Sequence, residues 1–503
     1  MHFGISVVPD MYPSISVEQQ KDSFSTKRSF FKGLIKDDYG FTKLSFTYRF
    51  LKTTDSSANK NKTYSENIPF NRNNTSDQFF YYWDLSNVNI DAGDELEFYF
   101  EVSDNDGLVG PKTTRSQTQI FKAPSLKEIA ENTEKNNESI KNDLKESIAQ
   151  AKALQKDLNE LTKKLLDKKE MTWEEKKKAE DLLKKQEELE KKLAELRAKN
   201  EKKNKEEQEY KKQSEDILQK QQQLQSLMDK LMTPEMKKLM EELQKLMEKV
   251  DKNQMQEQLS QMKLDNKDLQ KELERTIELF KKMEFEQKLD ENIEKLNELA
   301  KKQDELSKKS EEKNADSKDL KDKQDELNKE FEDFKKDMDE LAKKNDALEE
   351  KQDLPNTEEQ QKDIQSEMQN SSESLDSKKN SKASKSQKNA AKKMDEMAQQ
   401  MSKMQQQMEE EQAEEDMQAM RALLENLLRL SFDQEKLMQD LRTIDINNPQ
   451  YLKLSQQQRK LKDDAKMIED SLFALSKRVI QIQSKVNQEI LSLIHISEPT
   501  RPY

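Results

Sequence analysis

All six glycines of this 503-residue chain lie within its first 110 residues. Glycine adopts positive φ angles more readily than any other residue, so tight turns between β-strands depend on it. The rest of the chain lacks this residue and is rich in helix formers such as lysine, glutamate, glutamine and leucine. Only 32% of the residues are hydrophobic and 38% are charged, which excludes one large common core. The sequence therefore predicts an α+β multidomain protein, in which a β module precedes a long helical region.

Residues 1–124 show the alternation that is typical of β-strands. In Glu95–Val102 every second residue is apolar or aromatic, as in a strand with one buried face. Lys43–Phe50 repeats this pattern, whereas Phe79–Trp83 is aromatic throughout and is expected to be covered on both faces. Turn residues such as those of Asp91–Asp94 separate these segments. Short strands punctuated in this way predict an immunoglobulin-like β-sandwich.

The sequence assigns no catalytic, cofactor-binding or metal-binding residue, but four aspartates in predicted loops remain candidates for a metal site: Asp37, Asp38, Asp104 and Asp106. Carboxylate oxygens gathered at one end of a sandwich can bind calcium. Ordinary tight turns need the same residues, and their spacing matches no EF-hand loop. Turn formation and calcium binding both stay open. Acid/base chemistry by the adjacent carboxylates of Asp37 and Asp38 would need a positioned partner, which the sequence does not indicate.

Residues 125–370 carry an apolar stripe whose steps of three and four residues have the period of a helix. Between Leu182 and Leu196 these steps alternate as in a coiled coil. A helix is predicted to start after Thr172, which can form a capping box with Glu175. Prolines mark further starts and breaks. We expect long coiled-coil segments or helical hairpins, whose narrow stripes must meet a helix of the same chain, of a second copy or of another protein.

The C-terminal part of the chain divides into three segments. Residues 371–388 are mostly serine, lysine and asparagine and predict a polar linker or a fraying helix. Residues 389–490 predict a methionine- and leucine-rich helical region, with a stripe over Met394–Met408 that continues as leucines over Leu423–Leu428. A pliable helical core explains this stripe better than a soft-metal site does. Residues 491–503 resemble the translation of a sequencing adapter and are expected to be non-native.

The inventory of residues excludes several classes of function. Cysteine is absent and histidine occurs only at His2 and His495, so triads and histidine-built metal sites lack their components. A phosphate-binding loop needs glycine, which the helical region lacks. The formal net charge of -13 argues against a nucleic-acid partner. No stretch approaches the roughly 20 apolar residues of a membrane span, and the first residues do not form a signal peptide. The sequence thus predicts no enzyme and no cofactor.

Several segments together resemble the bacterial domain of unknown function 4175 family, especially its Bacteroidetes members: Asp37–Phe41, Phe98–Gly107, Pro124–Ile129, Met283–Leu289 and Leu461–Leu472. The resemblance implies a membrane-anchored envelope protein with β modules and a long helical part that faces away from the cytoplasm. It carries over no functional residues, because the family has no established activity. The chain is accordingly expected to be a periplasmic fragment, whose membrane contact would depend on an N-terminal anchor outside it.

Two functions follow as hypotheses. The first is a structural, scaffolding or tethering protein of the bacterial cell envelope, which binds protein partners, including a second copy, through its helical seams. The alternative is a β-sandwich that binds calcium or another ligand and is displayed on a helical stalk.

Overall fold

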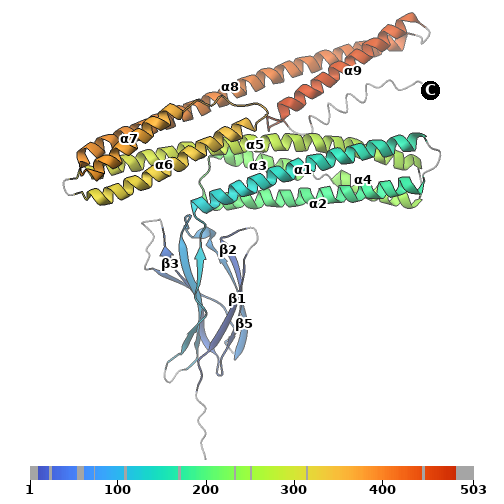
Figure 1. Ribbon diagram of the computed structural model, residues 1–503. Coiled ribbons are helices and arrows are strands. Elements are labelled where there is room, and N and C mark those ends of the chain that lie inside the picture. The colour runs from blue at the N-terminus through green and yellow to red at the C-terminus, as the bar shows by residue number, and fades with distance from the viewer. Residues whose placement is uncertain are drawn as a thin grey trace, which may run out of the picture. The chain divides into compact units, whose positions relative to one another are not determined.

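The computed structural model describes residues 10–21, 25–53, 62–72, 74–106, 110–167, 172–231, 234–249, 252–312, 315–444, 448–482 and 486. Antiparallel β-sheets form the N-terminal part, and long helices form the rest (Figure 1). The predicted α+β class is therefore confirmed. The expected non-native segment, residues 491–503, lies outside the described residues.

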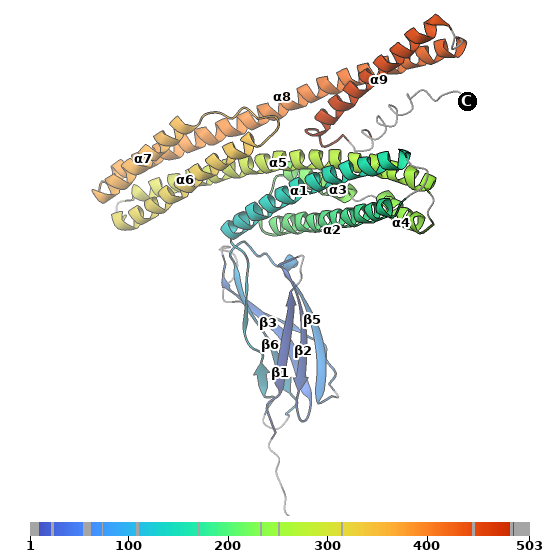
Figure 2. The same ribbon diagram turned by 45° about the vertical axis from the view of Figure 1, so that its right-hand side comes forward.

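Two antiparallel sheets make up the β module. One has the strand order β1-β2-β5, and the other has the order β4-β3-β6-β7, with β8 also paired to β6 (Figure 2). The strands are β1 (Ser14–Lys21), β2 (Arg28–Lys36), β3 (Phe41–Lys52), β4 (Thr63–Asn67), β5 (Ser76–Asp84), β6 (Glu95–Asp104), β7 (Thr113–Arg115) and β8 (Gln119–Lys122). All of these pairings are antiparallel, and each strand can therefore bury one face and expose the other.

Aromatic side chains from both sheets fill one common core. The rings of Phe31 on β2 and Phe100 on β6 lie 5.1 Å apart, and those of Phe46 on β3 and Trp83 on β5 lie 4.9 Å apart. Such edge-on pairs add to the free energy gained from burying the rings. Gly33 is required here, because a Cβ atom at this position would lie 2.1 Å from the Phe79 ring. The inward residues predicted in β3 and β6 are confirmed.

One prediction about β5 is wrong. Only one face of this aromatic strand is covered, because Phe79 and Trp83 are buried whereas Phe80 and Tyr82 are exposed. The reason is topological, since β5 belongs to a sheet that packs on its partner sheet through a single face.

The chain forms two compact units, of which the first combines Met1–Asp143 with Ala194–Glu215. It thus holds the β module together with the start of α1 (Leu126–Asp167) and the end of α2 (Trp173–Tyr210). The last turn of α2 contacts the loop before β2: the Thr26 hydroxyl lies 3.1 Å from a Glu209 carboxylate oxygen and 2.7 Å from the Tyr210 hydroxyl. The Lys27 ammonium lies over the Tyr210 ring, 4.7 Å from its centroid.

The second unit comprises Leu144–Leu193 and Asp216–Tyr503. The helices of the chain are α1 (Leu126–Asp167), α2 (Trp173–Tyr210), α3 (Glu215–Lys230), α4 (Pro234–Lys249), α5 (Lys252–Ser310), α6 (Ser317–Asp346), α7 (Glu358–Asp376), α8 (Asn380–Thr443) and α9 (Pro449–Ser476). None of the described helices is both long enough and apolar enough to cross a bilayer.

Helix starts follow the sequence signals. The backbone amide and the hydroxyl of Thr172 both donate to Glu175, at 2.7 and 2.9 Å, and α2 begins at the next residue. Pro449 is the first residue of α9, where a missing amide costs nothing. The stripe predicted between Leu182 and Leu196 is buried.

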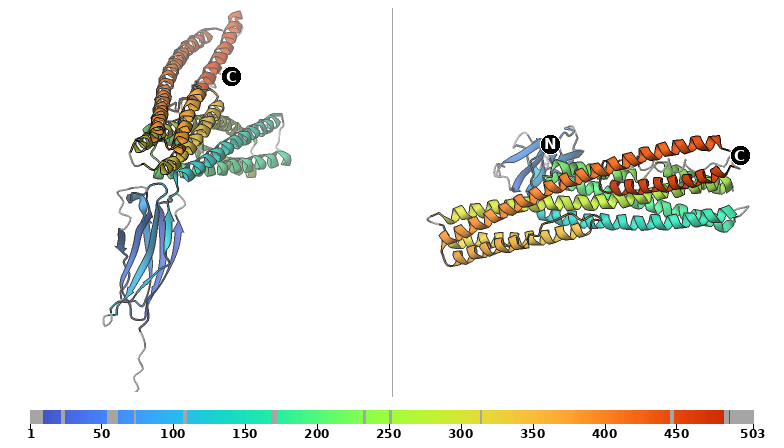
Figure 3. Two further views of the ribbon diagram at one scale, coloured as in Figure 1. Left: turned by 60° about the vertical axis from the view of Figure 1, so that its left-hand side comes forward. Right: turned by 90° about the horizontal axis from the view of Figure 1, so that it is seen from above.

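Helices α5, α6, α7 and α8 share the largest apolar core of the second unit, and α8 runs along both α5 and α7 (Figure 3). The methionine stripe of α8 lies in this core: Met394, Met397 and Met401 are buried, and Met404 and Met408 pack against them. Flexible thioether side chains suit this role, because they fill irregular gaps between helices.

The polar linker predicted over residues 371–388 is not a linker. The segment contains the end of α7, a short turn and the first turns of α8. In the turn, the Lys379 amide donates to the Ser374 carbonyl at 2.8 Å and the Lys378 amide to the Leu375 carbonyl at 2.9 Å. Lys378 has a φ of 55° and takes the left-handed position that glycine would usually occupy. Ser371, Ser374 and Ser384 of this segment are buried between helices, and Ser371 donates to Gln324.

A layer of buried polar side chains crosses the core of these four helices. The Gln324 side-chain carbonyl accepts hydrogen bonds from Gln303 at 2.8 Å, from Ser371 at 3.0 Å and from Gln387 at 3.1 Å. These four residues come from α6, α5, α7 and α8, and all are fully buried. Such a layer fixes how the helices align, because any sliding would leave polar groups unpaired in the core.

Arg275 of α5 is another buried polar anchor. Its guanidinium donates to the carbonyls of Ser476 at 2.8 Å and Ile480 at 3.2 Å, and also to that of Ile482. Burial lowers the pKa of this guanidinium, and attraction by Glu272 partly offsets the effect. The end of α9 is thus held by a cation on α5, which satisfies carbonyls that a helix end leaves unpaired.

We predict that Gln324→Leu destabilises the four-helix core by at least about 3 kcal/mol, because the donors of Gln303, Ser371 and Gln387 would lose their acceptor. Faster amide hydrogen exchange in α6 and α7, together with a lower urea midpoint, is the expected readout. Gln399→Leu, at an exposed position of α8, is the control and should change stability by no more than about 0.5 kcal/mol. Unchanged exchange in Gln324→Leu would show that the polar layer does not hold the helices together.

Candidate functional site

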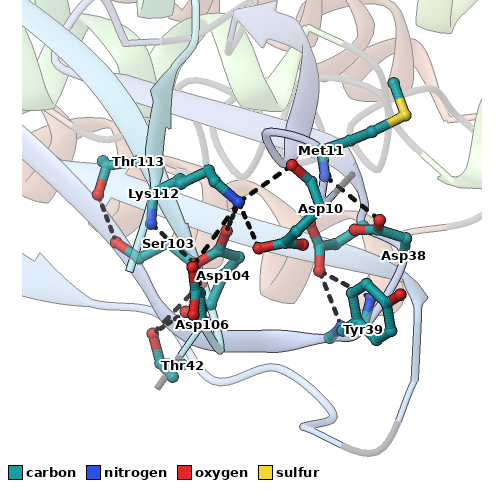
Figure 4. Close-up of polar contacts among 12 residues, drawn as sticks. Asp10, Met11, Asp38, Tyr39, Thr42, Ser103, Asp104, Asp106, Lys112 and Thr113 are labelled. Atoms are coloured by element: carbon teal, nitrogen blue, oxygen red, sulfur yellow. Dashed lines mark hydrogen bonds and ion pairs between the residues drawn. The ribbon is translucent and has the colours of Figure 1, made fainter. Parts of the chain in front are cut away.

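The four aspartates predicted as candidates lie at the end of the β module where β2 leads into β3 and β6 leads into β7 (Figure 4). Asp37 and Asp38 belong to the first connection, Asp104 is the last residue of β6, and Asp106 belongs to the second connection. The strand register brings the two connections together, because Phe41 pairs with Asp104. The Asn105 side-chain amide donates to the Tyr39 carbonyl at 2.7 Å and so joins them directly.

The Asp37 carboxylate stabilises the turn in which it lies. One carboxylate oxygen accepts from the amides of Tyr39 at 3.0 Å and Gly40 at 2.9 Å. Gly40 has a φ of 113°, a conformation that favours glycine. Asp38 instead accepts from the backbone amide of Met11 at 3.3 Å, and this contact ties the segment before β1 to the turn.

Asp104 is the most buried of the four aspartates, with an exposed fraction of 1%. One of its carboxylate oxygens accepts from the backbone amides of Asp106 at 3.2 Å and Lys112 at 2.8 Å. The Thr42 hydroxyl donates to its carbonyl at 2.6 Å. The carboxylate of Asp104 therefore ties the Asp106 and Lys112 backbone to the end of β6.

A lysine provides the positive charge of this cluster. The Lys112 ammonium lies 3.8 Å from the Asp104 carboxylate and 3.9 Å from that of Asp106, and it also pairs with the Asp10 carboxylate. It donates to the Asp10 carbonyl at 3.1 Å. The hydrogen bond with Asp10, supported by attraction from all three carboxylates, raises the pKa of Lys112, so this side chain stays charged at neutral pH.

This arrangement bears on the two interpretations of the aspartates. Asp37 and Asp104 form the hydrogen bonds that tight turns need, as the turn interpretation expects. A calcium ion between Asp104 and Asp106 would have to displace the Lys112 ammonium. Among the residues that the structure describes, no group of three or more acidic or histidine side chains is placed to hold a metal ion. The sequence did not single out Lys112 or Asp10, because their long-range pairing has no local signature.

A second polar cluster, also absent from the sequence analysis, borders a cavity of about 410 Å³ within the helical unit. The Lys220 ammonium of α3 lies 2.5 Å from the Asp216 carboxylate and 3.0 Å from that of Glu286 on α5. Burial lowers the pKa of Lys220, but the two carboxylates outweigh this effect and raise it overall. Burial also raises the pKa of Glu409 on α8; attraction by Lys220 partly offsets this effect, and repulsion from Asp216 and Glu286 adds to it. The cluster thus places one lysine among three carboxyl groups from α3, α5 and α8.

No protein-family model matches the sequence, and no curated protein or solved structure is significantly similar to it.

We predict that Lys112→Ala destabilises the β module, because Asp10, Asp104 and Asp106 would repel one another without the ammonium, and that calcium offsets part of this repulsion. The variant should melt at a lower temperature than the parent chain. Calcium at about 1 mM should restore part of the lost melting temperature, since weak calcium sites bind in this concentration range. Differential scanning fluorimetry with and without calcium measures both effects.

Lys43→Ala, at an exposed position on β3, is the matched control and should respond to calcium no more than the parent chain. If calcium stabilises the parent chain as strongly as Lys112→Ala, the lysine does not exclude the cation and the calcium interpretation of the aspartates gains support.

Proposed function

We propose that this chain is a non-catalytic scaffold or tether that associates with a second copy of itself through its helices. The observation that carries the proposal is an apolar stripe left exposed on α8, beyond the buried methionines. Leu424 and Leu428 are 56% and 59% exposed, although the sequence placed them in the helical core. The exposed stripe consists of Met417, Met420, Leu424, Leu428 and Phe432.

The stripe has the spacing of a helix surface that packs on another helix. Its members follow at steps of three or four residues, so they lie along one side of α8. A neighbouring side of the same helix is covered by α9, against which Leu423 packs in a core with Ile468 and Leu472. The hairpin of α8 and α9 thus buries one apolar stripe of α8 and leaves the other stripe of α8 exposed to the solvent. Contiguous exposed apolar surface of this kind marks interaction sites.

A second copy is the occupant that the neighbouring charges favour. Arg421, Glu425, Arg429 and Asp433 are exposed and follow at four-residue intervals, so they form a row of alternating sign beside the stripe. In an antiparallel pair of α8 helices, Arg421 would face Asp433 of the second copy while Glu425 would face Arg429. The row is therefore complementary to itself, and a partner of a single charge sign would meet as many like charges as opposite ones.

The proposal also includes an immunoglobulin-like sandwich, coiled-coil packing and membership of a protein family. The strand order supports an immunoglobulin-like sandwich, since β1, β2 and β5 correspond to strands A, B and E while β3, β6 and β7 correspond to C, F and G. The steps of three and four in the buried stripe of α8 support coiled-coil packing. Membership of the domain of unknown function 4175 family, and with it a place in the bacterial cell envelope, rests on the resemblance of sequence segments alone.

We predict that Leu424→Glu/Leu428→Glu weakens self-association of the whole chain by at least about 100-fold, because each copy would bring two carboxylates into an apolar contact. Sedimentation velocity over a range of concentrations should show a dimer for the parent chain and a monomer for the variant. Hydrogen exchange in α8 and α9 shows whether the hairpin itself is intact.

Leu452→Glu is the matched control, because Leu452 is an exposed leucine of α9 outside the stripe. This variant should dimerise like the parent chain. A parent chain that stays monomeric at every concentration, or a Leu452→Glu variant that dissociates equally, would contradict the proposal.

A further inference from the structure

The outer surface of the β1-β2-β5 sheet presents three aromatic rings to the solvent. Phe80 is 70% exposed, and Phe30 and Tyr82 are each 46% exposed. Phe30 on β2 pairs with Tyr82 on β5, and their ring centroids lie 4.9 Å apart. Phe80 lies two residues before Tyr82 and therefore on the same face of β5. These three residues, here called the aromatic face, lie outside the core of the module, which the inward residues of the same strands already fill.

Stability of the sheet explains only part of this surface. A cross-strand aromatic pair such as Phe30 and Tyr82 contributes about 0.2–1 kcal/mol to pairing of the strands. Phe80 lies directly opposite Lys32 and is the most exposed of the three rings. A ring of this size gains little burial from such a position, and a threonine would also favour the strand without exposing an apolar ring. The exposure of Phe80 therefore points to a ligand.

The groups around the aromatic face are polar but electrically balanced. Strand register places Gln20 beside Phe30, and it places Glu18 directly opposite Lys32. At the other end of the face, the Arg28 guanidinium lies 3.5 Å from the Asp84 carboxylate, which also accepts from the Tyr82 hydroxyl at 3.1 Å. Each charged group next to the rings thus has a group of opposite charge near it, and the aromatic face carries little net charge.

We propose that the aromatic face binds an uncharged glycan chain. The C–H face of a pyranose ring carries a weak positive potential and stacks on the negative face of an aromatic ring. Its hydroxyl groups both donate and accept hydrogen bonds, as do the side-chain amides of Gln20 and the nearby Gln78. A single-stranded nucleic acid also stacks on aromatic rings, but it needs the positive groove that this surface lacks. A purely apolar protein partner would bury Gln20, Glu18 and Lys32 at a cost.

The test uses the whole chain and four soluble, uncharged polysaccharides as probes: hydroxyethyl cellulose, a mixed-linkage β-glucan, a galactomannan and soluble starch. Retardation in native gels that contain each polysaccharide measures binding, and isothermal titration with the matching oligosaccharide gives the affinity. At least one probe should be retained. Phe80→Ala should weaken its binding by at least about tenfold, since one stacked ring is lost.

Tyr39→Ala is the matched control, because Tyr39 is a comparably exposed ring, at 58%, in a loop of the same module. It should bind like the parent chain, and melting curves should show that both variants are folded. The proposal is overturned if no probe is retained, or if Phe80→Ala and Tyr39→Ala bind equally well. It is also overturned if Phe80→Ala changes the sedimentation of the chain and leaves glycan retention unchanged, since the face would then bind another copy.

Discussion

The helical part of this protein depends on the pairing of narrow apolar stripes along polar helices. A chain with 38% charged residues cannot surround its helices with apolar side chains, so each helix has little more than one stripe to bury. Stripes of this kind attract one another without specifying a register. The buried amides of Gln303, Gln324 and Gln387 supply that register in the four-helix core, and Arg275 does so where α9 meets α5. Polar groups thus specify the alignment that the apolar groups stabilise.

The β module is stabilised differently from the helices, because its short chain segment forms two sheets around one core. Large aromatic rings fill this core from both sides, and each strand contributes alternate residues to it. At the loop end, Lys112 draws the segment before β1 onto the end of β6, and the Met11 amide joins the same segment to Asp38 after β2. Asp104 and Asp106, two of the four carboxylates that resemble a cation site in the sequence, therefore already pair with a cation that belongs to the chain. The aromatic face, in contrast, leaves the Phe80 ring 70% exposed.

Periodicity allowed much of the fold to be predicted from the sequence. The alternation in Glu95–Val102 and the steps of three and four in α2 and α8 gave the correct elements, and Thr172 with Glu175 gave a correct helix start. Composition misled for residues 371–388, because Ser371 there is buried between helices and donates to Gln324. Alternation also cannot say which face of an aromatic strand is covered, so the exposure of Phe80 was missed. For the candidate site, the four aspartates were found, but their lysine partner was not, since residues 10 and 112 are brought together only by the completed sheets.

The methionines along α8 make the two halves of this helix differ in their susceptibility to oxidation. Met394, Met397 and Met401 are buried in the four-helix core, whereas Met417 and Met420 lie in the exposed stripe. Oxidants convert an accessible thioether into a sulfoxide, which is polar and accepts hydrogen bonds from water. The thioethers of the core are shielded from this reaction by their neighbours. Under oxidative stress the exposed half of α8 would therefore become hydrophilic first, and a reductase that acts on sulfoxides would return it to its original state.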